Sequence, residues 1–265
     1  MTTVVLTRPK GKNTALASAL QAKGLGTIEL PALSIQPTLT SLSPEYLPDS
    51  FDLLVFVSAQ AASLYLRLLA NKGLSLLKGQ CIATVGAASA KPFYDAGLET
   101  NLELIHPPAD HPYQDSEALW LLLQPRLCRF ERVLLVRGQQ GREWLGQQLI
   151  DAQKTLIRCS IYERVPAQWA ETDTQELTVA LQQPSDVITL LTSSESTQAI
   201  YTNMVRLGLE EKWLQSSFVA IHPRIAQSLE NLTSLSCAQA SRQMTLCAPS
   251  QPAMLDALLS AAMPK

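Results

Sequence analysis

The stretch Arg158-Cys-Ser-Ile-Tyr-Glu-Arg-Val-Pro166 decides the predicted fold. It contains apolar and β-branched residues and ends in a proline, so it favours extended backbone over helix. Leu30-Pro-Ala-Leu-Ser-Ile-Gln-Pro37 has the same character. We interpret the two stretches as linkers that cross between two α/β domains and pair as a small antiparallel ladder. Tyr162 would then face the cleft between the domains, where ligands commonly lie; packing of its ring on a domain edge is the alternative.

Segments typical of strands and helices alternate on both sides of these linkers. The first of them form a β-α-β unit, with strands at 4–7 and 27–30 and a helix at 14–23. Later strands are predicted at 52–58 and 81–86, each followed by a helix. Parallel strands joined by helices predict a doubly wound open sheet.

The pattern then repeats. Arg132–Gly138 resembles Thr3–Pro9, and the strands at 185–193 and 218–223 resemble those at 52–58 and 81–86. An internal duplication therefore predicts two related α/β domains. We expect domain 1 to comprise residues 1–33 and 167–265 and domain 2 residues 38–160, with 34–37 and 161–166 as the linkers.

Composition excludes several classes of protein. Of the 265 residues, 46% are hydrophobic and 17% charged, and the net charge of −2 comes without a basic run, which argues against nucleic acid or an anionic membrane as partner. We expect no signal peptide and no membrane span. The five cysteines, Cys81, Cys128, Cys159, Cys237 and Cys247, form no Cys-x-x-Cys pair, which indicates thiols in a reducing cytoplasm. Apart from Asp110 in the loop of His106 and His111, the three histidines have no acidic or cysteine partner at metal-ligand spacing, so no metal site is expected.

Candidate ligand contacts follow the predicted strands, because ligands of open α/β sheets bind at the carboxyl ends of the strands. Serine and glycine at helix starts expose N–H groups that bind carboxylates or phosphates, although simple N-capping explains any single serine. Arg8 and Arg137 occupy matching places, and each could bind an anion or pair with a nearby acid. The candidate binding residues are Arg8, Pro9, Ser58, Gly86, Ser89, Arg137, Gly138, Ser193, Ser194, His222 and Pro223.

Sharper motifs are absent from the sequence. Gly24-Leu-Gly26 follows a helix and is no dinucleotide fingerprint, and there is no triphosphate-binding Gly-x-x-x-x-Gly-Lys loop. Ser193 lies in no Gly-x-Ser-x-Gly elbow. No side chain is marked as a nucleophile, so an enzyme with this sequence would work mainly by holding its substrate.

An ordered set of short motifs resembles the uroporphyrinogen-III synthase family across nearly the whole chain. The motifs are Val-Leu-Thr-Arg-Pro, Asp-Leu-Leu-Val-Phe-Val-Ser, Thr-Val-Gly-x-x-Ser-Ala, Val-Leu-Leu-Val-Arg-Gly-x-x-Gly-Arg, Ile-Tyr-Glu-Arg and Ala-Ile-x-Pro-x-Ile-Ala. The resemblance implies two flavodoxin-like domains with parallel sheets, joined by a two-stranded ladder. It implies a cytoplasmic lyase of porphyrin and heme biosynthesis that cyclises hydroxymethylbilane to uroporphyrinogen III, with inversion of ring D, loss of water and no cofactor or metal.

The resemblance also implies roles for particular residues. Tyr162 matches the family tyrosine that donates or relays a proton to the leaving hydroxyl, and Ser58, Ser89, Ser193 and Ser194 match positions near the cleft. His222-Pro223-Arg224-Ile225 departs from the family pattern of Gly-Pro followed by small hydroxyl residues. We expect a monomer, with a transient contact to the preceding pathway enzyme left open. The alternative function is a non-catalytic two-domain binder of small anions, which needs no Tyr162; a remnant of a regulatory fusion is disfavoured, since no DNA-binding or membrane segment is evident.

Overall fold

The computed structural model describes residues 1–233 and 243–263. The chain divides into two units: unit 1 comprises Met1–Ser34 and Val165–Lys265, and unit 2 comprises Ile35–Arg164. The chain passes from one unit to the other inside β3 (Leu33–Pro37) and inside β8 (Thr155–Pro166), which are neighbours in one sheet. The stretches expected to be linkers are therefore parts of regular strands.

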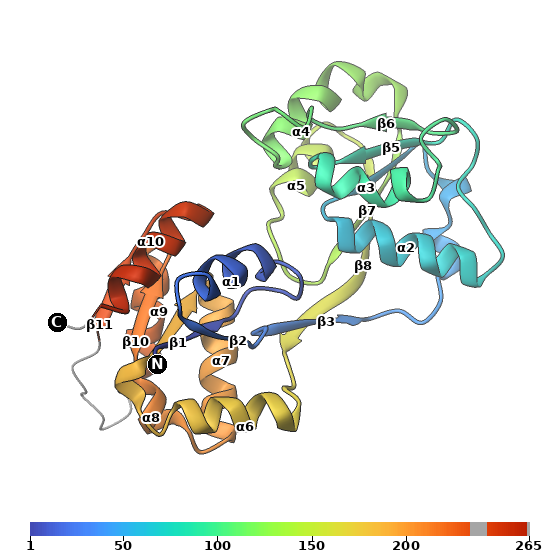
Figure 1. Cartoon of the computed structure of the whole chain (residues 1–265). Helices are drawn as coiled ribbons and strands as arrows, with labels where there is room; N and C mark the ends of the chain where they lie inside the picture. The colour runs from blue at the N-terminus through green and yellow to red at the C-terminus, as the bar shows by residue number, and fades with distance from the viewer. Residues whose placement is uncertain (234–242, 264–265) are drawn as a thin grey trace. The chain divides into compact units, whose positions relative to one another are not determined.

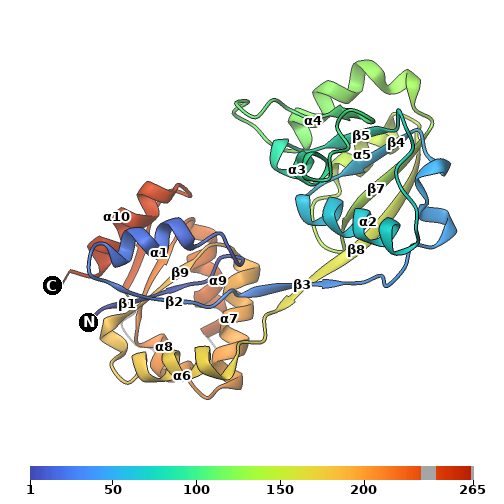
Figure 2. The same cartoon turned by 45° about the vertical axis from the view of Figure 1, so that its right-hand side comes forward.

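Unit 1 is a parallel sheet in the order β2-β1-β9-β10-β11, with helices on both faces (Figures 1 and 2). Alternate residues of β1 enter different cores: Val4 and Leu6 pack towards α1 and α10, and Val5 towards α6, α7, α8 and α9. Burial on both faces explains the continuous apolar runs. The strands are β1 (Thr3–Leu6), β2 (Gly26–Glu29), β9 (Val187–Leu191), β10 (Ser217–Ala220) and β11 (Gln243–Leu246). The helices are α1 (Thr14–Gln21), α6 (Glu171–Ala180), α7 (Ser194–Arg206), α8 (Glu210–Leu214), α9 (Pro223–Thr233) and α10 (Gln251–Ala261), with a 3-10 turn at Pro184–Asp186.

Unit 2 has the sheet order β3-β8-β7-β4-β5-β6, in which the strands from β8 to β6 are parallel. Leu54 and Phe56 of β4 face the core under α2 and α3, whereas Leu53 and Val55 face the core under α4 and α5. The remaining strands are β4 (Leu53–Phe56), β5 (Cys81–Thr84), β6 (Glu103–Ile105) and β7 (Arg132–Gly138). The helices are α2 (Ala59–Asn71), α3 (Ala87–Asp95), α4 (Ser116–Leu123) and α5 (Trp144–Asp151), with 3-10 turns at Pro44–Tyr46, Pro48–Ser50 and Gln124–Arg129.

The two mostly parallel sheets confirm the predicted fold class, and their strands occupy corresponding places. Strands β8-β7-β4-β5-β6 of unit 2 take the places of β2-β1-β9-β10-β11 in unit 1. Unit 1 fills these places in the flavodoxin-like chain order 2-1-3-4-5, whereas unit 2 fills them in the circularly permuted order 5-4-1-2-3, because β4, β5 and β6 precede β7 and β8 in the chain. In both units the direction of winding reverses beside the first of these strands in the chain. The reversal lies between β1 and β9 in unit 1 and between β7 and β4 in unit 2, and ligands of such sheets bind outside the strand ends at this point.

Asp115 caps α4, because the Asp115 carboxylate accepts the Ala118 N–H at 2.9 Å. Cys237 lies outside the described residues, while Cys81, Cys128, Cys159 and Cys247 are free thiols. In the ranges 1–233 and 243–263, no helix has both the length and the apolar character needed to span a membrane.

Candidate active site

A β-bulge places Tyr162 at the carboxyl edge of the unit 2 sheet. Along the β7–β8 pair, Arg137 stands opposite Ser160 but Gly138 stands opposite Tyr162, so Ile161 is an extra residue in β8. The Gln139 N–H then donates to the Tyr162 carbonyl at 2.7 Å. An extra residue shifts the alternation of side chains by one position. Tyr162 consequently packs in the same core as Ile161, on the side of α2 and α3.

The Tyr162 side chain spans the reversal point between β7 and β4. Its Oη lies 3.2 Å from the Oγ of Ser58, the second residue after β4. Its ring lies against Gly138 at the end of β7, where an added Cβ would come within 2.7 Å of the ring. Only 4% of Tyr162 is exposed. The phenol thus joins the ends of the two central strands and is held from both sides.

Ser58 has two partners at once. It is the N-cap of α2, and its Oγ accepts the Ala61 N–H at 3.1 Å. A serine hydroxyl carries one proton and can accept as well as donate. Because Oγ already accepts from the backbone, the Ser58 proton is available to Tyr162 Oη, which leaves the phenolic proton available to another group.

Gly86 and Ser89 lie at the start of α3, but the turn is covered. Gln114 Oε1 accepts the Ala87 N–H at 2.8 Å, and Gln114 Nε2 donates to the Pro108 carbonyl at 2.6 Å. A Cβ at Gly86 would meet Gln114 Oε1 at 2.5 Å, so a larger residue there would displace the Gln114 side chain. Ser89 is buried. The expected exposed N–H at this turn is therefore already bonded to a side chain from the loop before α4.

Arg137 is paired with an acid. Its side chain is 4% exposed, its Nη1 bonds to Glu143 Oε1, and its Nε donates to the Gly138 carbonyl at 3.0 Å. Glu143 also accepts from Arg158 Nε at 3.3 Å. Of the two roles considered for Arg137, the ion pair is the one that the structure contains.

Arg8, the counterpart of Arg137 in unit 1, has different partners. Its Nε donates to Asn13 Oδ1 at 3.2 Å, and Asn13 Nδ2 donates back to the Arg8 carbonyl at 3.1 Å. Arg8 Nη2 is buried without a hydrogen-bond partner among the described residues. Burial lowers the pKa of Arg8, and the charge of Glu29 opposes that shift. Pro9 follows it on the exposed surface.

A hollow of about 650 Å³ lies beside the starts of α7 and α9. Ser193 caps α7 by accepting the Ser196 N–H at 3.0 Å. His222 Nδ1 accepts the Arg224 N–H at 3.1 Å in the first turn of α9. Pro223 is the first residue of α9 and does not line the hollow. The lining residues are Thr192, Ser193, Ser194, Glu195, Ile221, His222, Arg224, Ile225 and Pro249. Three of the sequence candidates therefore share one hollow at the carboxyl edge of unit 1.

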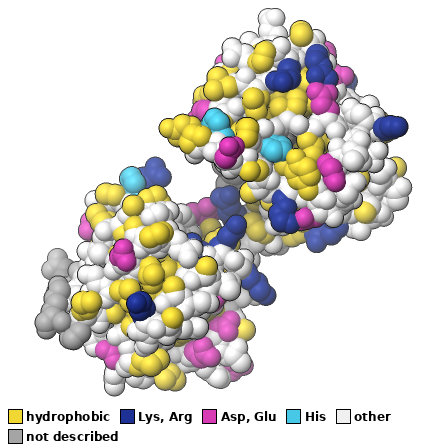
Figure 3. All heavy atoms as spheres, turned by 45° about the horizontal axis from the view of Figure 1, so that its top comes forward, with side chains coloured by type: hydrophobic (Ala, Val, Ile, Leu, Met, Phe, Trp, Pro, Cys, Tyr) yellow, Lys and Arg dark blue, Asp and Glu magenta, His cyan; other side chains and the backbone are white. Residues whose placement is uncertain are grey.

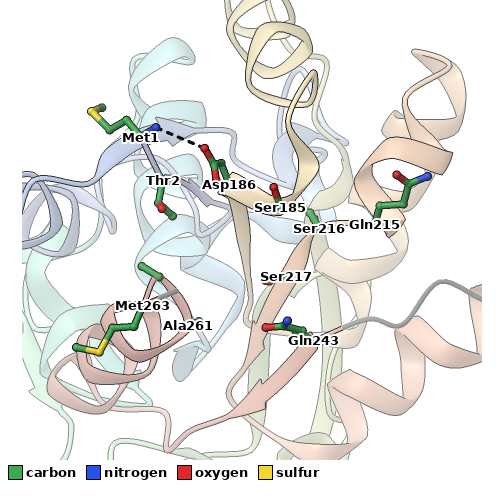
Figure 4. Close-up of a pocket in the computed structure, with 11 residues that line it drawn as sticks. Met1, Thr2, Ser185, Asp186, Gln215, Ser216, Ser217, Gln243, Ala261 and Met263 are labelled. Carbon is green, nitrogen blue, oxygen red and sulfur yellow. Dashed lines mark hydrogen bonds and ion pairs between the residues drawn. The ribbon is translucent and has the colours of Figure 1, made fainter. Parts of the chain in front are cut away.

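A second hollow, of about 610 Å³, lies at the opposite edge of unit 1 (Figure 4). Its lining includes Met1, Asp186 and Ser217, which precede or begin strands, and the Met1 ammonium pairs with Asp186 at 3.5 Å. Because ligands of doubly wound sheets bind at the carboxyl ends, we assign no function to this hollow. Charges of both signs are mixed over the face in Figure 3. Within the described ranges, no three His, Cys, Asp or Glu side chains could together hold a metal ion.

Sequence reasoning missed three residues of these edges, namely Asn13, Gln114 and Arg224. Asn13 precedes a predicted helix, which is a usual place for an N-cap and hides its contact with Arg8. Gln114 acts from a loop with no periodic pattern. Arg224 lies within a turn that the sequence did single out, and its place in the hollow follows from the start of α9.

These features define a two-unit, doubly wound α/β protein with hydroxyl groups, helix starts and a phenol at the carboxyl edges of its sheets. Residues 14–244 match the family described as uroporphyrinogen-III synthase HemD. The chain therefore belongs to the uroporphyrinogen-III synthase family, a family of cyclising lyases in tetrapyrrole biosynthesis, and the resemblance noted from the sequence motifs is confirmed.

Solved structures agree on the fold. Uroporphyrinogen-III synthetase from Helicobacter pylori 26695 is 15% identical with a TM-score of 0.57, over 98% of this chain and 99% of that chain. A mutant uroporphyrinogen III synthase from the extremely thermophilic bacterium Thermus thermophilus is 14% identical with a TM-score of 0.52, over 98% of both chains. At such identities, these likenesses bear on the fold alone.

Proposed function

We propose that this chain converts hydroxymethylbilane to uroporphyrinogen III, with inversion of ring D and loss of water. Membership of the family supports the substrate, which is a linear tetrapyrrole with eight carboxylates. The observation that carries the proposal is the position of Tyr162, whose Oη lies 3.2 Å from Ser58 Oγ at the reversal point of the unit 2 sheet. An anion binder would not need a phenol there.

In this proposal Tyr162 acts as a general acid. The C–O bond of the terminal hydroxymethyl group breaks as the phenol transfers its proton to the leaving oxygen, which departs as water. The remaining azafulvene cation is attacked by the far end of the tetrapyrrole through a spiro intermediate, and the proton lost from carbon restores the phenol. Ser58 supports this step because its own proton can stabilise the phenolate oxygen.

The polar groups at the carboxyl edge of unit 1 would hold the carboxylates. Ser194, His222 and Arg224 line the hollow beside α7 and α9, and the starts of both helices carry positive potential without formal charge. A net charge of −2 is therefore compatible with a substrate that bears eight carboxylates. Rigid positioning would favour ring D inversion over simple end-to-end closure.

The decisive experiment uses freshly prepared hydroxymethylbilane. We expect the type III isomer to dominate the products after oxidation and chromatographic separation, at a rate far above spontaneous cyclisation. Formation of the type I isomer alone, at the spontaneous rate, would reject the enzyme and favour the non-catalytic anion binder. Heat-inactivated protein supplies the spontaneous rate in the same buffer.

We also propose that the protein acts in the cytoplasm as a monomer and meets the preceding enzyme of the pathway only transiently. The free thiols of Cys81, Cys128, Cys159 and Cys247 support a reducing compartment. Sedimentation at micromolar concentration should give the mass of one chain, 29.0 kDa. A stable dimer over that range would contradict the monomer.

A further inference from the structure

The loop between β1 and α1 concentrates positive charge. Arg8, Lys10 and Lys12 are three cations within five residues. Lys10 and Lys12 are exposed, and none of the three forms an ion pair within the described part of the chain. The loop follows the carboxyl end of β1, and the Thr7 hydroxyl donates to the Leu190 carbonyl of the neighbouring β9. The three cationic residues therefore lie on the loop that follows β1, at the reversal point of the unit 1 sheet.

Asn13 holds Arg8 instead of capping its helix. Asn13 is fully buried and stands at the N-cap position of α1, but its side chain makes no capping hydrogen bond. An N-cap asparagine normally accepts an N–H from the first turn of the helix. Here both polar atoms of the amide bond to Arg8 instead. The first turn of α1 therefore lacks the stabilising side-chain cap, and the Asn13 amide holds the Arg8 side chain in place.

The duplicated unit shows the contrasting arrangement. Glu143 occupies the N-cap position of α5, as Asn13 does in α1, and it neutralises Arg137. Asn13 is uncharged, so Arg8 keeps its positive charge. The buried Arg8 Nη2 has no partner among the described residues, an uncommon state for a native donor. The N-cap residue thus neutralises the arginine in unit 2 but not in unit 1, where the charge of Glu29 acts on Arg8 without an ion pair between them.

We propose that the loop Arg8–Asn13 is a carboxylate-binding loop, in which Arg8 contacts a carboxylate, Lys10 and Lys12 add charge around it, and Asn13 positions Arg8. The ligand class is a polycarboxylate, so the inference deepens the proposed function and rests on it for the identity of the natural ligand. A guanidinium can donate two parallel hydrogen bonds to one carboxylate, which an isolated amide cannot do.

Binding of uroporphyrin III, the stable oxidised form of the product, tests the loop without catalysis. Neutralising Lys10 or Lys12 with glutamine should weaken binding by about two- to fivefold per lysine, and the loss should shrink in high salt. Arg8→Gln should weaken binding by about tenfold or more. Lys23→Gln, an exposed lysine beyond the other end of α1, is the matched control and should bind as the unchanged protein does.

Asn13→Asp copies the unit 2 arrangement at nearly constant size. The change also removes the hydrogen bond from Asn13 Nδ2 to the Arg8 carbonyl, so its thermal unfolding midpoint is measured beside that of Arg8→Gln. In the folded variant, uroporphyrin III binding should weaken about as much as in Arg8→Gln, with little further loss in an Arg8→Gln background. In the cyclisation assay it should raise KM more than it lowers kcat. If the Asn13→Asp and the lysine variants all bound uroporphyrin III as the unchanged protein does, the proposal that this loop binds carboxylates would be wrong. Since these titrations need no turnover, a protein that binds uroporphyrin III but makes no type III product would refute the proposed function and leave the loop standing.

Discussion

The hydroxyl of Tyr162 lies 3.2 Å from the hydroxyl of Ser58, and this contact joins β8 to the first turn of α2. Tyr162→Phe removes only the phenolic oxygen. If Tyr162 is the general acid, the cyclisation rate should fall by about two to four orders of magnitude. The thermal unfolding midpoint should change little, because the ring still packs against Gly138. A variant with full activity would remove the tyrosine from the mechanism.

Variants of Ser58, made with and without the Tyr162 hydroxyl, test whether Ser58 acts through Tyr162. Ser58→Ala loses the hydrogen bond from the Ala61 N–H as well as the contact with Tyr162, so it should cost about 1 kcal/mol of stability and also lower kcat. Ser58→Thr keeps a hydroxyl and should recover most of both. In a Tyr162→Phe background, Ser58→Ala should cost stability but little further activity. An equal loss of kcat in both backgrounds would show that Ser58 acts independently of the phenol.

Gly138 is required by the ring above it. Its φ is not in the left-handed region, but an added Cβ would lie 2.7 Å from Tyr162 Cε2. Gly138→Ala should therefore cost about 1–3 kcal/mol in urea unfolding and displace the phenol, with a fall in activity. Tyr162→Ala in the same chain should remove the steric part of the cost. If Gly138→Ala lowered the free energy of unfolding equally in the Tyr162 and Tyr162→Ala proteins, the contact between Gly138 and the ring would not explain the loss.

Asp52 should contribute a part of stability that depends on acid pH. The backbone N–H groups of Arg132 and Glu131 donate to Asp52 Oδ2, and these bonds lower the pKa of the carboxyl group. Because the folded pKa lies below the unfolded value of about 3.9, the stabilisation is present above that value and is lost as pH falls through the folded pKa.

Urea unfolding at pH 7 and at stepwise lower pH checks this effect. Asp52→Asn should be less stable than the unchanged protein at pH 7, and the difference should shrink as the medium becomes acid. Glu99→Gln is the control, since Glu99 is exposed and has no hydrogen bond or ion pair within residues 1–233 and 243–263. A constant difference at all pH values would assign the loss to something other than ionisation.

The thiols should differ sharply in reactivity. Burial raises the pKa of Cys81 and of Cys159 to about 12, whereas Cys128 is exposed. Iodoacetamide at pH 8 should label Cys128 in the native protein, and should label Cys81 and Cys159 only after unfolding. Peptide mass spectrometry measures each site, with Cys128→Ser as the control. Rapid native labelling of Cys159 would mean that β8 opens near Tyr162.

The fold could be predicted from the sequence because its information is local. Both-face burial makes β4 a continuous apolar run, and the repeated strand-helix pattern revealed the two related units before any sheet order was known. The divisions of the chain after Ser34 and after Arg164 fall inside the segments 34–37 and 161–166 that the sequence predicts as linkers. Strand pairing in the sheet decides that β3 and β8 extend through the residues expected to be linkers.

The site was less predictable because its details depend on contacts distant in sequence. Arg8 and Arg137 look equivalent in the two repeats, but Asn13 and Glu143 give them opposite electrostatic environments. The bulge at Ile161 that turns Tyr162 towards Ser58 depends on the register against β7. Gln114 covers the Gly86 turn from a loop that no periodicity marks. Sequence therefore located the edges of the sheets but not the partners of each side chain.

The place of β1 between β2 and β9 has a consequence for how the chain is made. A ribosome releases β1 first, yet β9 begins only at Val187, after all of unit 2 has been synthesised. Unit 2 can assemble its whole sheet during translation, while the amino-terminal segment waits with one side of its central strand unpaired. If translation stopped after Arg164 and before Val187, the product would contain all of unit 2, together with β1 and β2 without their partner strand β9.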